Sequence, residues 1–335
     1  MISKLIEQEI DAFHIIDIGC RGELNPKWKP IEHKVNLHGF DPDQEECERL
    51  SRKSNNFKSV TYHSFAVAGH SGTATLYKTR SGACYSLLKP DTEWLARFSF
   101  HELFDILGEE QLTVRDLSHI EALTGLDIDI LKIDSQGLEL EILKGAEELV
   151  EKSFYVETES GFTPNYIHES TQAQVDEYMR SKGFLLFDLV LSRMTHDNIF
   201  KDVNKHHSML LWSESIWLKD FISMFKMNQL KPGENIDRKK SVKALTICAI
   251  QGCIDYGYEL AKIFNELGLL SNLELASLGK ESAWMLFNSS EIKSQSKYLN
   301  FILRCLPTSL RNKIRVEAEL ASKQTHIFKR TKNGQ

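Results

Sequence analysis

Short apolar runs alternate with polar, helix-like segments in the first part of the chain. Residues 14–18 and 35–40 are rich in β-branched and other apolar side chains, and residues 60–67 repeat this pattern. The first run stops at Gly19, and the second stops at Asp41. Parallel strands joined by crossover helices produce such an alternation. The pattern therefore predicts an α/β protein.

The segments that connect these runs differ in character. Pro42 can occupy the first turn of a helix, and residues 43–52 follow it with acidic side chains near their start, as the helix dipole favours. Residues 68–126 interrupt the alternation and are interpreted as an insertion over the edge of the sheet. Within this insertion we expect a hairpin strand at residues 73–78 and helical stretches on either side of Gly108.

The alternation resumes at residues 127–134 (DIDILKID), which are interpreted as a buried strand. A later helix over residues 171–182 should end at Gly183, a frequent position for glycine at a helix C-terminus. The last two strands are joined by a connection too short for a crossover helix, so they should pair antiparallel. The pattern thus predicts a seven-stranded sheet with an antiparallel last strand, at residues 14–18, 35–40, 60–67, 127–134, 154–159, 184–190 and 208–212.

The end of the chain has a different, purely helical pattern. Residues 231–240 are polar, contain proline and glycine, and are interpreted as a linker. Apolar residues then recur at intervals of three and four over residues 242–267, which predicts a long amphipathic helix. We expect further helices at residues 271–289 and 296–322. The chain is therefore divided into a domain of residues 1–230 and a helical module of residues 231–335.

Charge and composition exclude several classes of protein. With 41 Lys and Arg against 47 Asp and Glu, the formal net charge is −6, which does not favour binding to nucleic acid. No apolar run approaches the roughly 20 residues of a membrane span, and acidic residues interrupt the N-terminus where a signal peptide would be apolar. The six cysteines are scattered singly, which is typical of reduced thiols. We expect a cytoplasmic protein with no integral membrane segment.

The end of the first predicted strand carries the first candidate binding site. It reads Asp17-Ile18-Gly19, and Asp41 follows at the end of the second strand, 22 residues after Gly19. A glycine turn lets a ligand approach the backbone, and an acid at the next strand end can accept both ribose hydroxyls. The third glycine of a dinucleotide-binding turn is missing, and Asp17 would repel a diphosphate but attract an ammonium group. The arrangement fits S-adenosylmethionine better than a nicotinamide cofactor, although a tight turn without a ligand remains an alternative.

Two further acids stand at predicted strand ends. Asp134 closes the run at residues 127–134, and Glu159 closes the strand at residues 154–159. Ligands of open α/β sheets bind outside the carboxyl ends of the strands, so Asp134 should share one crevice with Asp17 and Asp41, and Glu159 should stand on the same edge. Asp134 has an alternative interpretation as a helix N-cap or as a structural partner of Lys132.

Several spaced blocks of the chain, in this order, resemble a known family. From about residue 13 to about residue 219, the chain is similar to the FkbM family of S-adenosylmethionine-dependent methyltransferases. The most specific block resembles the family pattern K-[IL]-D-x-[EQ]-G-x-E-x-x-[VIL]-L-x-G. The blocks are IIDIGCRGELNPKW, HGFDPDQEECERL, AVAGHSGTATLY, CYSLLKPD, DILKIDSQGLELEILKGA and ETESGFTPNY.

The resemblance implies a class I methyltransferase fold that uses S-adenosylmethionine and methylates hydroxyl groups of sugars, glycans or related natural products. The sequence departs from the family at Arg21, where many members have Asn, so contacts to the methionine carboxylate of the cofactor can differ. The cofactor-binding residues that it implies are Asp17, Gly19, Arg21, Asp41, Ala66 and Asp134.

Transfer of a methyl group to a hydroxyl needs alignment of the two reactants and a base for the hydroxyl proton. Asp134 and Glu159 are the catalytic candidates because both stand at strand ends facing the crevice. His168, in the loop after Tyr166, is the next candidate, and an exposed loop histidine is its alternative interpretation. No metal site is predicted, because two acids do not define one. Among the tryptophans, Trp28 is the one to test for stacking against a sugar.

The leading hypothesis is therefore an O-methyltransferase acting on a sugar, glycan or small-molecule hydroxyl. The alternative is a non-catalytic scaffold or binding protein with the same fold in a glycan-biosynthesis complex. The C-terminal helices leave open a homodimer contact, a glycosyltransferase partner or a cover over the active site. A nicotinamide oxidoreductase is disfavoured by the incomplete glycine pattern.

Overall fold

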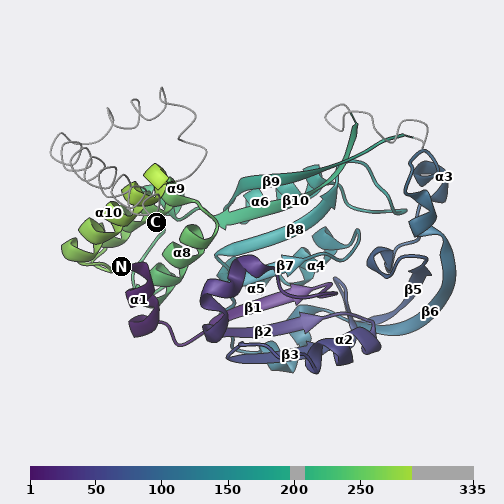
Figure 1. The fold of residues 1–335 in the computed structure, drawn as a ribbon, viewed down its shortest axis with the longest axis horizontal. Coiled ribbons are helices and arrows are strands. Elements are labelled where there is room, and N and C mark those ends of the chain that lie inside the picture. The colour runs from purple at the N-terminus through teal and green to yellow at the C-terminus, as the bar shows by residue number, and fades with distance from the viewer. Residues whose placement is uncertain (197–207, 289–335) are drawn as a thin grey trace, which may run out of the picture.

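The computed structural model describes residues 1–196 and 208–288 of the chain. Within them, seven strands form one twisted sheet in the order β3-β2-β1-β7-β8-β10-β9 (Figure 1). Only β10 runs antiparallel to its neighbours in this sheet, and it pairs with both β8 and β9. This arrangement confirms the α/β class and the class I methyltransferase sheet. The strands are β1 (Phe13–Ile18), β2 (Val35–Phe40), β3 (Ser59–His63), β7 (Ile130–Ile133), β8 (Tyr155–Gly161), β9 (Phe184–Met194) and β10 (Met209–Lys219).

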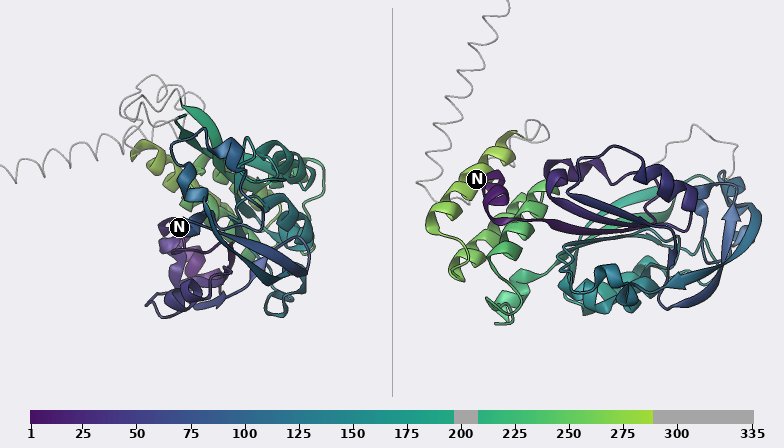
Figure 2. Two further views of the ribbon diagram at one scale, coloured as in Figure 1. Left: turned by 90° about the vertical axis from the view of Figure 1, so that its right-hand side faces the viewer. Right: turned by 90° about the horizontal axis from the view of Figure 1, so that it is seen from below.

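Helices on one face of the sheet form its first core. They are α4 (Glu139–Gly145), α5 (Glu147–Lys152) and α6 (Gln172–Ser181), which lie together on one side in Figure 2. Thr171 and Gln174 form a capping box at the start of α6, which fixes this helix end. Alternate residues of β1, such as Ile16 and Ile18, point into this core, and Phe13 and Ile15 belong to the core on the opposite face.

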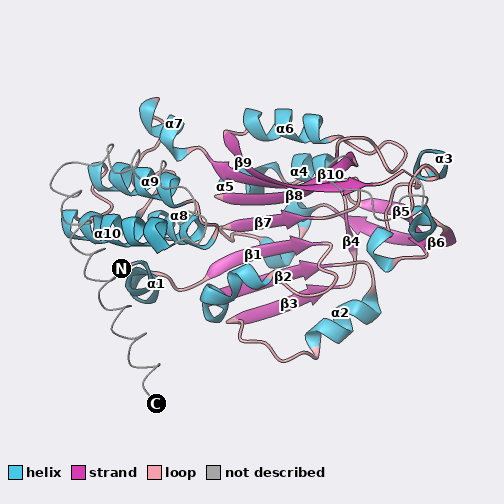
Figure 3. Ribbon diagram, turned by 45° about the horizontal axis from the view of Figure 1, so that its top comes forward, coloured by secondary structure: helices cyan, strands magenta, loops and turns pink. Residues whose placement is uncertain are grey.

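The insertion forms a second, three-stranded sheet, with the strand order β4-β6-β5. Its strands are β4 (Ala66–Val67), β5 (Gly72–Thr79) and β6 (Ile106–Arg115), and the short helix α3 (Thr92–Leu95) lies between β5 and β6. Figure 3 shows this sheet beyond the arrowheads of the central parallel strands, so the insertion lies over their carboxyl ends.

Two expectations for this region are wrong. Residues 60–67 are not one strand, because the chain leaves the large sheet after His63 and β4 pairs with β6 instead. The expected helical stretch after Gly108 is also wrong, since β6 runs through Gly108 and pairs antiparallel with β5. Most side chains of β6 are partly or fully exposed, so its sequence lacks the apolar alternation by which a half-buried strand is recognised.

The helices at the two ends of the chain pack together. They are α1 (Ile2–Glu9), α7 (Phe221–Lys226), α8 (Arg238–Ile250), α9 (Ile254–Glu266) and α10 (Asn272–Asn288), and α2 (Gln44–Ser51) stands apart between β2 and β3. The single helix expected at residues 242–267 is wrong, because Gly252 adopts a left-handed conformation (φ +72°) and separates α8 from α9. The helix expected at residues 271–289 is α10, and the one at 296–322 lies outside the described residues.

The C-terminal helices meet the sheet at the amino ends of its parallel strands. The Phe221 ring stacks on Phe154, just before β8, with ring centroids 5.3 Å apart. Lys243 of α8 forms a 2.8 Å ion pair with Asp129, whose carboxylate also accepts a hydrogen bond from the His14 backbone. The expectation that these helices cover the site is wrong for the described residues, because α7–α10 lie at the opposite end from the insertion (Figure 1). The division at residue 230 stays a prediction.

None of the described helices combines the length and the apolar character needed to cross a membrane. Both Cys248 and Cys253 lie in the core shared by the sheet and the helices.

Candidate active site

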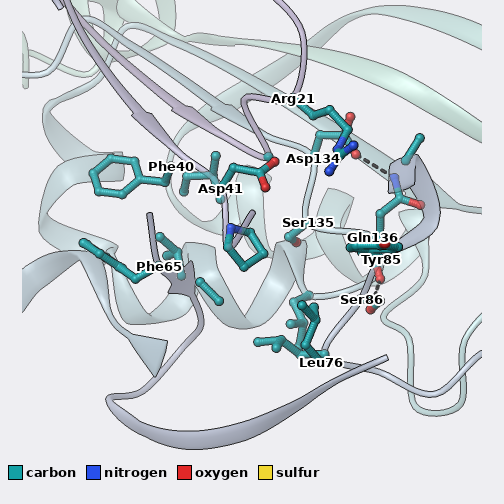
Figure 4. Close-up of a pocket in the computed structure, with 18 of the residues that line it drawn as sticks. Arg21, Phe40, Asp41, Phe65, Leu76, Tyr85, Ser86, Asp134, Ser135 and Gln136 are labelled. Atoms are coloured by element: carbon teal, nitrogen blue, oxygen red, sulfur yellow. Dashed lines mark hydrogen bonds between the residues drawn. The ribbon is translucent and has the colours of Figure 1, made fainter. Parts of the chain in front are cut away.

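The carboxyl ends of the parallel strands surround a cavity of about 170 Å³ (Figure 4). Its floor comes from the ends of β1, β2 and β7, and residues of the insertion, including Tyr85 and Ser86, form its other wall. Five of the residues implied as cofactor ligands line this cavity, namely Gly19, Arg21, Asp41, Ala66 and Asp134.

The turn after β1 is packed against the end of β7. Gly19 has φ +71°, and a Cβ atom at this position would lie 1.9 Å from the backbone oxygen of Asp134. The backbone N–H of Gly19 donates to the Phe40 oxygen at 2.9 Å, and the Asp134 N–H donates to the Ile18 oxygen at 3.0 Å. Glycine is therefore required by both the conformation and the space, as the motif predicted.

Asp41 lies at the end of β2 and is buried in the wall of the cavity. One carboxylate oxygen accepts a hydrogen bond from the Asp43 N–H at 2.8 Å. Burial raises the pKa of Asp41, and the Asp43 hydrogen bond opposes this shift. Phe40 and Phe65 line the cavity beside it, so a carboxylate adjoins an apolar slot. This combination fits a nucleoside, whose ribose hydroxyls can donate to the acid while the base lies against apolar side chains.

Asp17 does not line the cavity. It is 3% exposed, and it lies directly across from Lys132 in the pairing of β1 with β7. The Lys132 ammonium donates to its carboxylate at 3.0 Å, whereas burial raises the pKa of Asp17. A direct contact between Asp17 and the amino group of a ligand is thus not supported by its position, and its cofactor role stays a prediction.

Arg21 lies at the edge of the cavity facing the insertion. It is paired with Asp43 and stands over the Tyr85 ring, with 5.6 Å between its central carbon and the ring centroid. A Cβ atom on Gly82 would lie 2.5 Å from an Arg21 nitrogen, so the insertion approaches this side chain closely. The cavity therefore has a fixed cation at one end and the Asp41 carboxylate at another.

A second cavity, of about 350 Å³, adjoins the first. The two share Ala83, Asp134 and Gln136, so they form one continuous cleft. Glu159 lines the second cavity and is not among the residues of the first. Aromatic side chains from three parts of the chain supply much of its wall, namely Phe100, Phe104, Tyr166 and Trp212.

Gln136 connects the two cavities through hydrogen bonds. Its side-chain amide donates to Asp134 at 2.7 Å and to Glu159 at 3.3 Å, and its oxygen accepts from the Tyr166 hydroxyl at 2.9 Å. The Ser86 hydroxyl donates to the Gln136 backbone oxygen at 2.7 Å (Figure 4). Gln136 has φ +57°, a conformation that costs a non-glycine residue free energy and that often marks functional sites.

The environment of Glu159 favours its protonated form. Burial and the adjacent, hydrogen-bonded Asp134 carboxylate raise the pKa of Glu159 to about 10. Glu159 therefore keeps its proton to a higher pH than an exposed carboxyl group does. Glu139 is also buried below the cleft, where burial raises its pKa to about 7, and it accepts hydrogen bonds from the backbone and hydroxyl of Ser135.

Two side chains singled out in the sequence are not brought to the cleft. His168 is exposed on its loop and lines neither cavity. The expectation that Trp28 is available for stacking is wrong, because Trp28 is 3% exposed and packs edge-on against Tyr155, with ring centroids 5.3 Å apart. The tryptophan at the cleft is Trp212 on β10. Among residues 1–196 and 208–288, no three His, Cys, Asp or Glu side chains are grouped to hold a metal ion.

Comparisons with solved structures give distant matches to methyltransferases. Magnesium protoporphyrin IX methyltransferase from Synechocystis PCC 6803, with bound SAM, is 9% identical, covers 65% of this chain and 76% of its own, and has a TM-score of 0.31. A SAM-dependent methyltransferase from Methanosarcina mazei is 9% identical over 64% of this chain and 96% of its own, with a TM-score of 0.31. A putative tRNA (m1A22) methyltransferase from Streptococcus pneumoniae is 7% identical over 84% and 94%, with a TM-score of 0.33.

Comparison with protein families gives a direct match. No curated protein matches the sequence, but residues 29–186 match the model of the methyltransferase FkbM domain. The matched range contains Asp41, Asp134 and Glu159, which the fold brings to one cleft. Residues 29–186 are therefore assigned to the methyltransferase FkbM domain.

Proposed function

We propose that this protein transfers a methyl group from S-adenosylmethionine to a hydroxyl oxygen of a sugar, glycan or related metabolite. The observation that carries the proposal is the position of Asp134, where the two cavities join, with Glu159 beside it. In this arrangement the first cavity holds the cofactor and the second holds the acceptor. The Asp134–Glu159 pair then lies where a reacting hydroxyl would be placed.

The residues of the first cavity are suited to the parts of this cofactor. Asp41 would accept hydrogen bonds from the ribose hydroxyls, and Phe40 and Phe65 would border the adenine. Arg21 is the charged group available at the edge of the cavity for the methionine carboxylate. The bound cofactor supplies an electrophilic methyl carbon, so the protein must orient the acceptor and exclude water.

The acidic pair would take the proton of the acceptor. An alcohol is a weak nucleophile, and a positioned base contributes about 10² to 10⁴ in rate. Asp134 lines both cavities and is therefore the member of the pair that would accept the hydroxyl proton. Gln136 donates to both carboxyl groups and would hold their oxygens in place.

The proposal is tested by changing each acid of the pair to its amide. Asp134→Asn should lower kcat by at least about tenfold while changing the Kd for S-adenosylhomocysteine little, because the base acts on the acceptor proton. Glu159→Gln should lower kcat less, because the amide keeps an uncharged side chain beside Asp134. Glu177→Gln is the control, since Glu177 on α6 is exposed and lines neither cavity. Near-full turnover in both test variants would show that alignment alone drives the reaction.

A further inference from the structure

Two buried polar atoms of the second cavity have no partner. The Ser160 hydroxyl and the Asn165 side-chain oxygen make no hydrogen bond with any described residue. Ser160 is 2% exposed and Asn165 is 6% exposed, and both line this cavity. Burying a polar atom without a partner is unfavourable, so such atoms are rare in folded proteins. Their position at the cleft indicates that a ligand with hydroxyl groups supplies the missing hydrogen bonds.

The same cavity has an acidic lining. Four of its residues are Asp134, Glu139, Glu159 and Glu169, and none of the described residues that line it is Lys, Arg or His. The Glu169 carboxylate accepts hydrogen bonds from the backbone N–H groups of Asn165 and Tyr166, so it fixes the loop that carries Asn165. An anionic ligand group would therefore lie among carboxyl groups and find no cation among these residues.

The remaining wall of the second cavity is apolar and aromatic. Trp212 lies near Phe100, with ring centroids 6.0 Å apart, and Phe104 lies beside Phe100 at 5.6 Å. A sugar ring presents C–H groups on its faces and hydroxyls around its edge. Aromatic rings on one side and unpartnered hydrogen-bonding atoms on another match that distribution.

Resting on the proposed function, we infer that the acceptor is a sugar without an anionic group at the reacting ring, either neutral or amino-bearing. Ser160 and Asn165 are the residues that recognise its hydroxyls. The Ser160 hydroxyl can donate or accept, and the Asn165 oxygen accepts. A uronic acid or a phosphorylated ring would place its charge against the acids of the cavity, and those acids then act as a filter.

The experiment compares three matched methyl glycosides on the protein loaded with S-adenosylhomocysteine. The probes are the methyl glycosides of glucose, glucosamine and glucuronic acid, and binding is measured by saturation-transfer NMR. The neutral and amino probes should bind at least about tenfold more tightly than the glucuronide. A glucuronide that binds as well as the neutral probe overturns the inference.

The remaining outcomes separate this inference from the proposed function. The sugars are tested at up to about 50 mM, a concentration on the order of that needed to detect weak ligands. If S-adenosylhomocysteine binds but none of the three sugars does, the assignment of a sugar as the acceptor is wrong, and the assignment of the cofactor site stands. Failure to bind S-adenosylhomocysteine contradicts the proposed function itself.

Variants identify the recognising residues. Ser160→Ala and Asn165→Ala should each weaken binding of the neutral glycoside by about three- to tenfold, the effect of one neutral hydrogen bond. Ser153→Ala is the control, because Ser153 is equally buried just before the same strand and bonds only to a backbone oxygen of α5. If the folded Ser160→Ala and Asn165→Ala proteins bind the glycoside with the affinity of the wild type, the two atoms form their hydrogen bonds with water, and the inference is wrong.

Discussion

Gln136 combines a strained backbone with hydrogen bonds to three side chains of the cleft. Its left-handed conformation is one that glycine adopts without cost, yet the position holds a long polar side chain. That side chain contacts Asp134, Glu159 and Tyr166. The strain is therefore retained for the interactions that the side chain makes, which is typical of a functional site.

Paired substitutions of Gln136 separate strain from function. Gln136→Ala and Gln136→Gly remove the same hydrogen bonds, but only glycine relieves the left-handed backbone. The glycine variant should have a free energy of unfolding about 1 kcal/mol higher than the alanine variant. Both variants should lose most of their turnover. Urea titration gives the difference in stability, and equal stability of the two would mean that the loop relaxes in the variants.

The raised pKa of Glu139 should make the free energy of unfolding depend on pH. Burial raises its pKa from 4.5 to about 7. Between these values the folded protein keeps a proton that the unfolded chain has lost, so the free energy of unfolding falls as the pH rises from 4.5 to 7 and is constant above. The total loss from this group is on the order of 3 kcal/mol.

Glu139→Gln should abolish this part of the pH dependence, because the amide does not titrate. The difference in unfolding free energy between wild type and variant, measured by urea titration at pH 5, 6, 7 and 8, should favour the wild type most at pH 5. A difference that stays constant over this range would show that Glu139 does not titrate there.

Asp41 is the residue on which cofactor affinity should depend most directly. Asp41→Ala removes the carboxylate that faces the apolar slot. Loss of a charge-assisted hydrogen bond to the ribose should weaken binding of S-adenosylhomocysteine by about 1.5 to 3 kcal/mol, measured by calorimetry. Asp188→Ala, on an exposed position of β9, is the control. Unchanged affinity in Asp41→Ala would remove this residue from the site.

At the level of elements, the strands buried on both faces could be predicted from the sequence. The run at residues 35–40 gave β2 with the bounds that the structure has, because its apolar residues and the following acid mark both ends. By contrast, β6 is largely exposed and pairs with β5 far from the main core, so its sequence carries little strand signal. The break between α8 and α9 rests on one glycine inside an apolar pattern that continues across it.

The candidate site divides in the same way. Gly19, Asp41 and Asp134 follow strand ends, and the rule that parallel strands end at one edge is sufficient to bring them together. Asp17 also stands near a strand end, but its carboxylate is buried and accepts a hydrogen bond from Lys132 on the neighbouring strand. Which residues complete the second cavity depends on how the insertion folds back and on where β10 ends. Trp212 therefore had no sequence signal that separated it from core tryptophans.

At the level of the whole molecule, the C-terminal helices share a core with the sheet. Phe264 of α9 packs against Phe221, with ring centroids 6.3 Å apart, and both belong to one cluster with Phe13 of β1. The described helical residues, up to residue 288, thus contribute to the stability of the first part, and the division into two modules stays a prediction about function.

Phe264→Ala tests this coupling, since Phe264 is 0% exposed. Truncation of a buried phenylalanine should lower the free energy of unfolding by about 3 to 5 kcal/mol. The Kd of the folded protein for S-adenosylhomocysteine should not change, because the cleft lies at the other end of the sheet. Calorimetric binding well below the melting temperature provides the measurement, and weaker binding there would reveal communication between the two ends.

The contact between the Gly19 turn and the end of β7 limits how far these two segments can move relative to each other. These two pieces of main chain touch without any intervening side chain, and one borders the first cavity while the other carries the Asp134 carboxylate. In the proposed reaction, the spacing between the methyl donor and Asp134 would thereby be set by adjacent, hydrogen-bonded backbones and not by rotamers. Such a pair can drift only as far as the sheet itself deforms, so thermal motion should misalign the reactants less than in a site built on two separate loops.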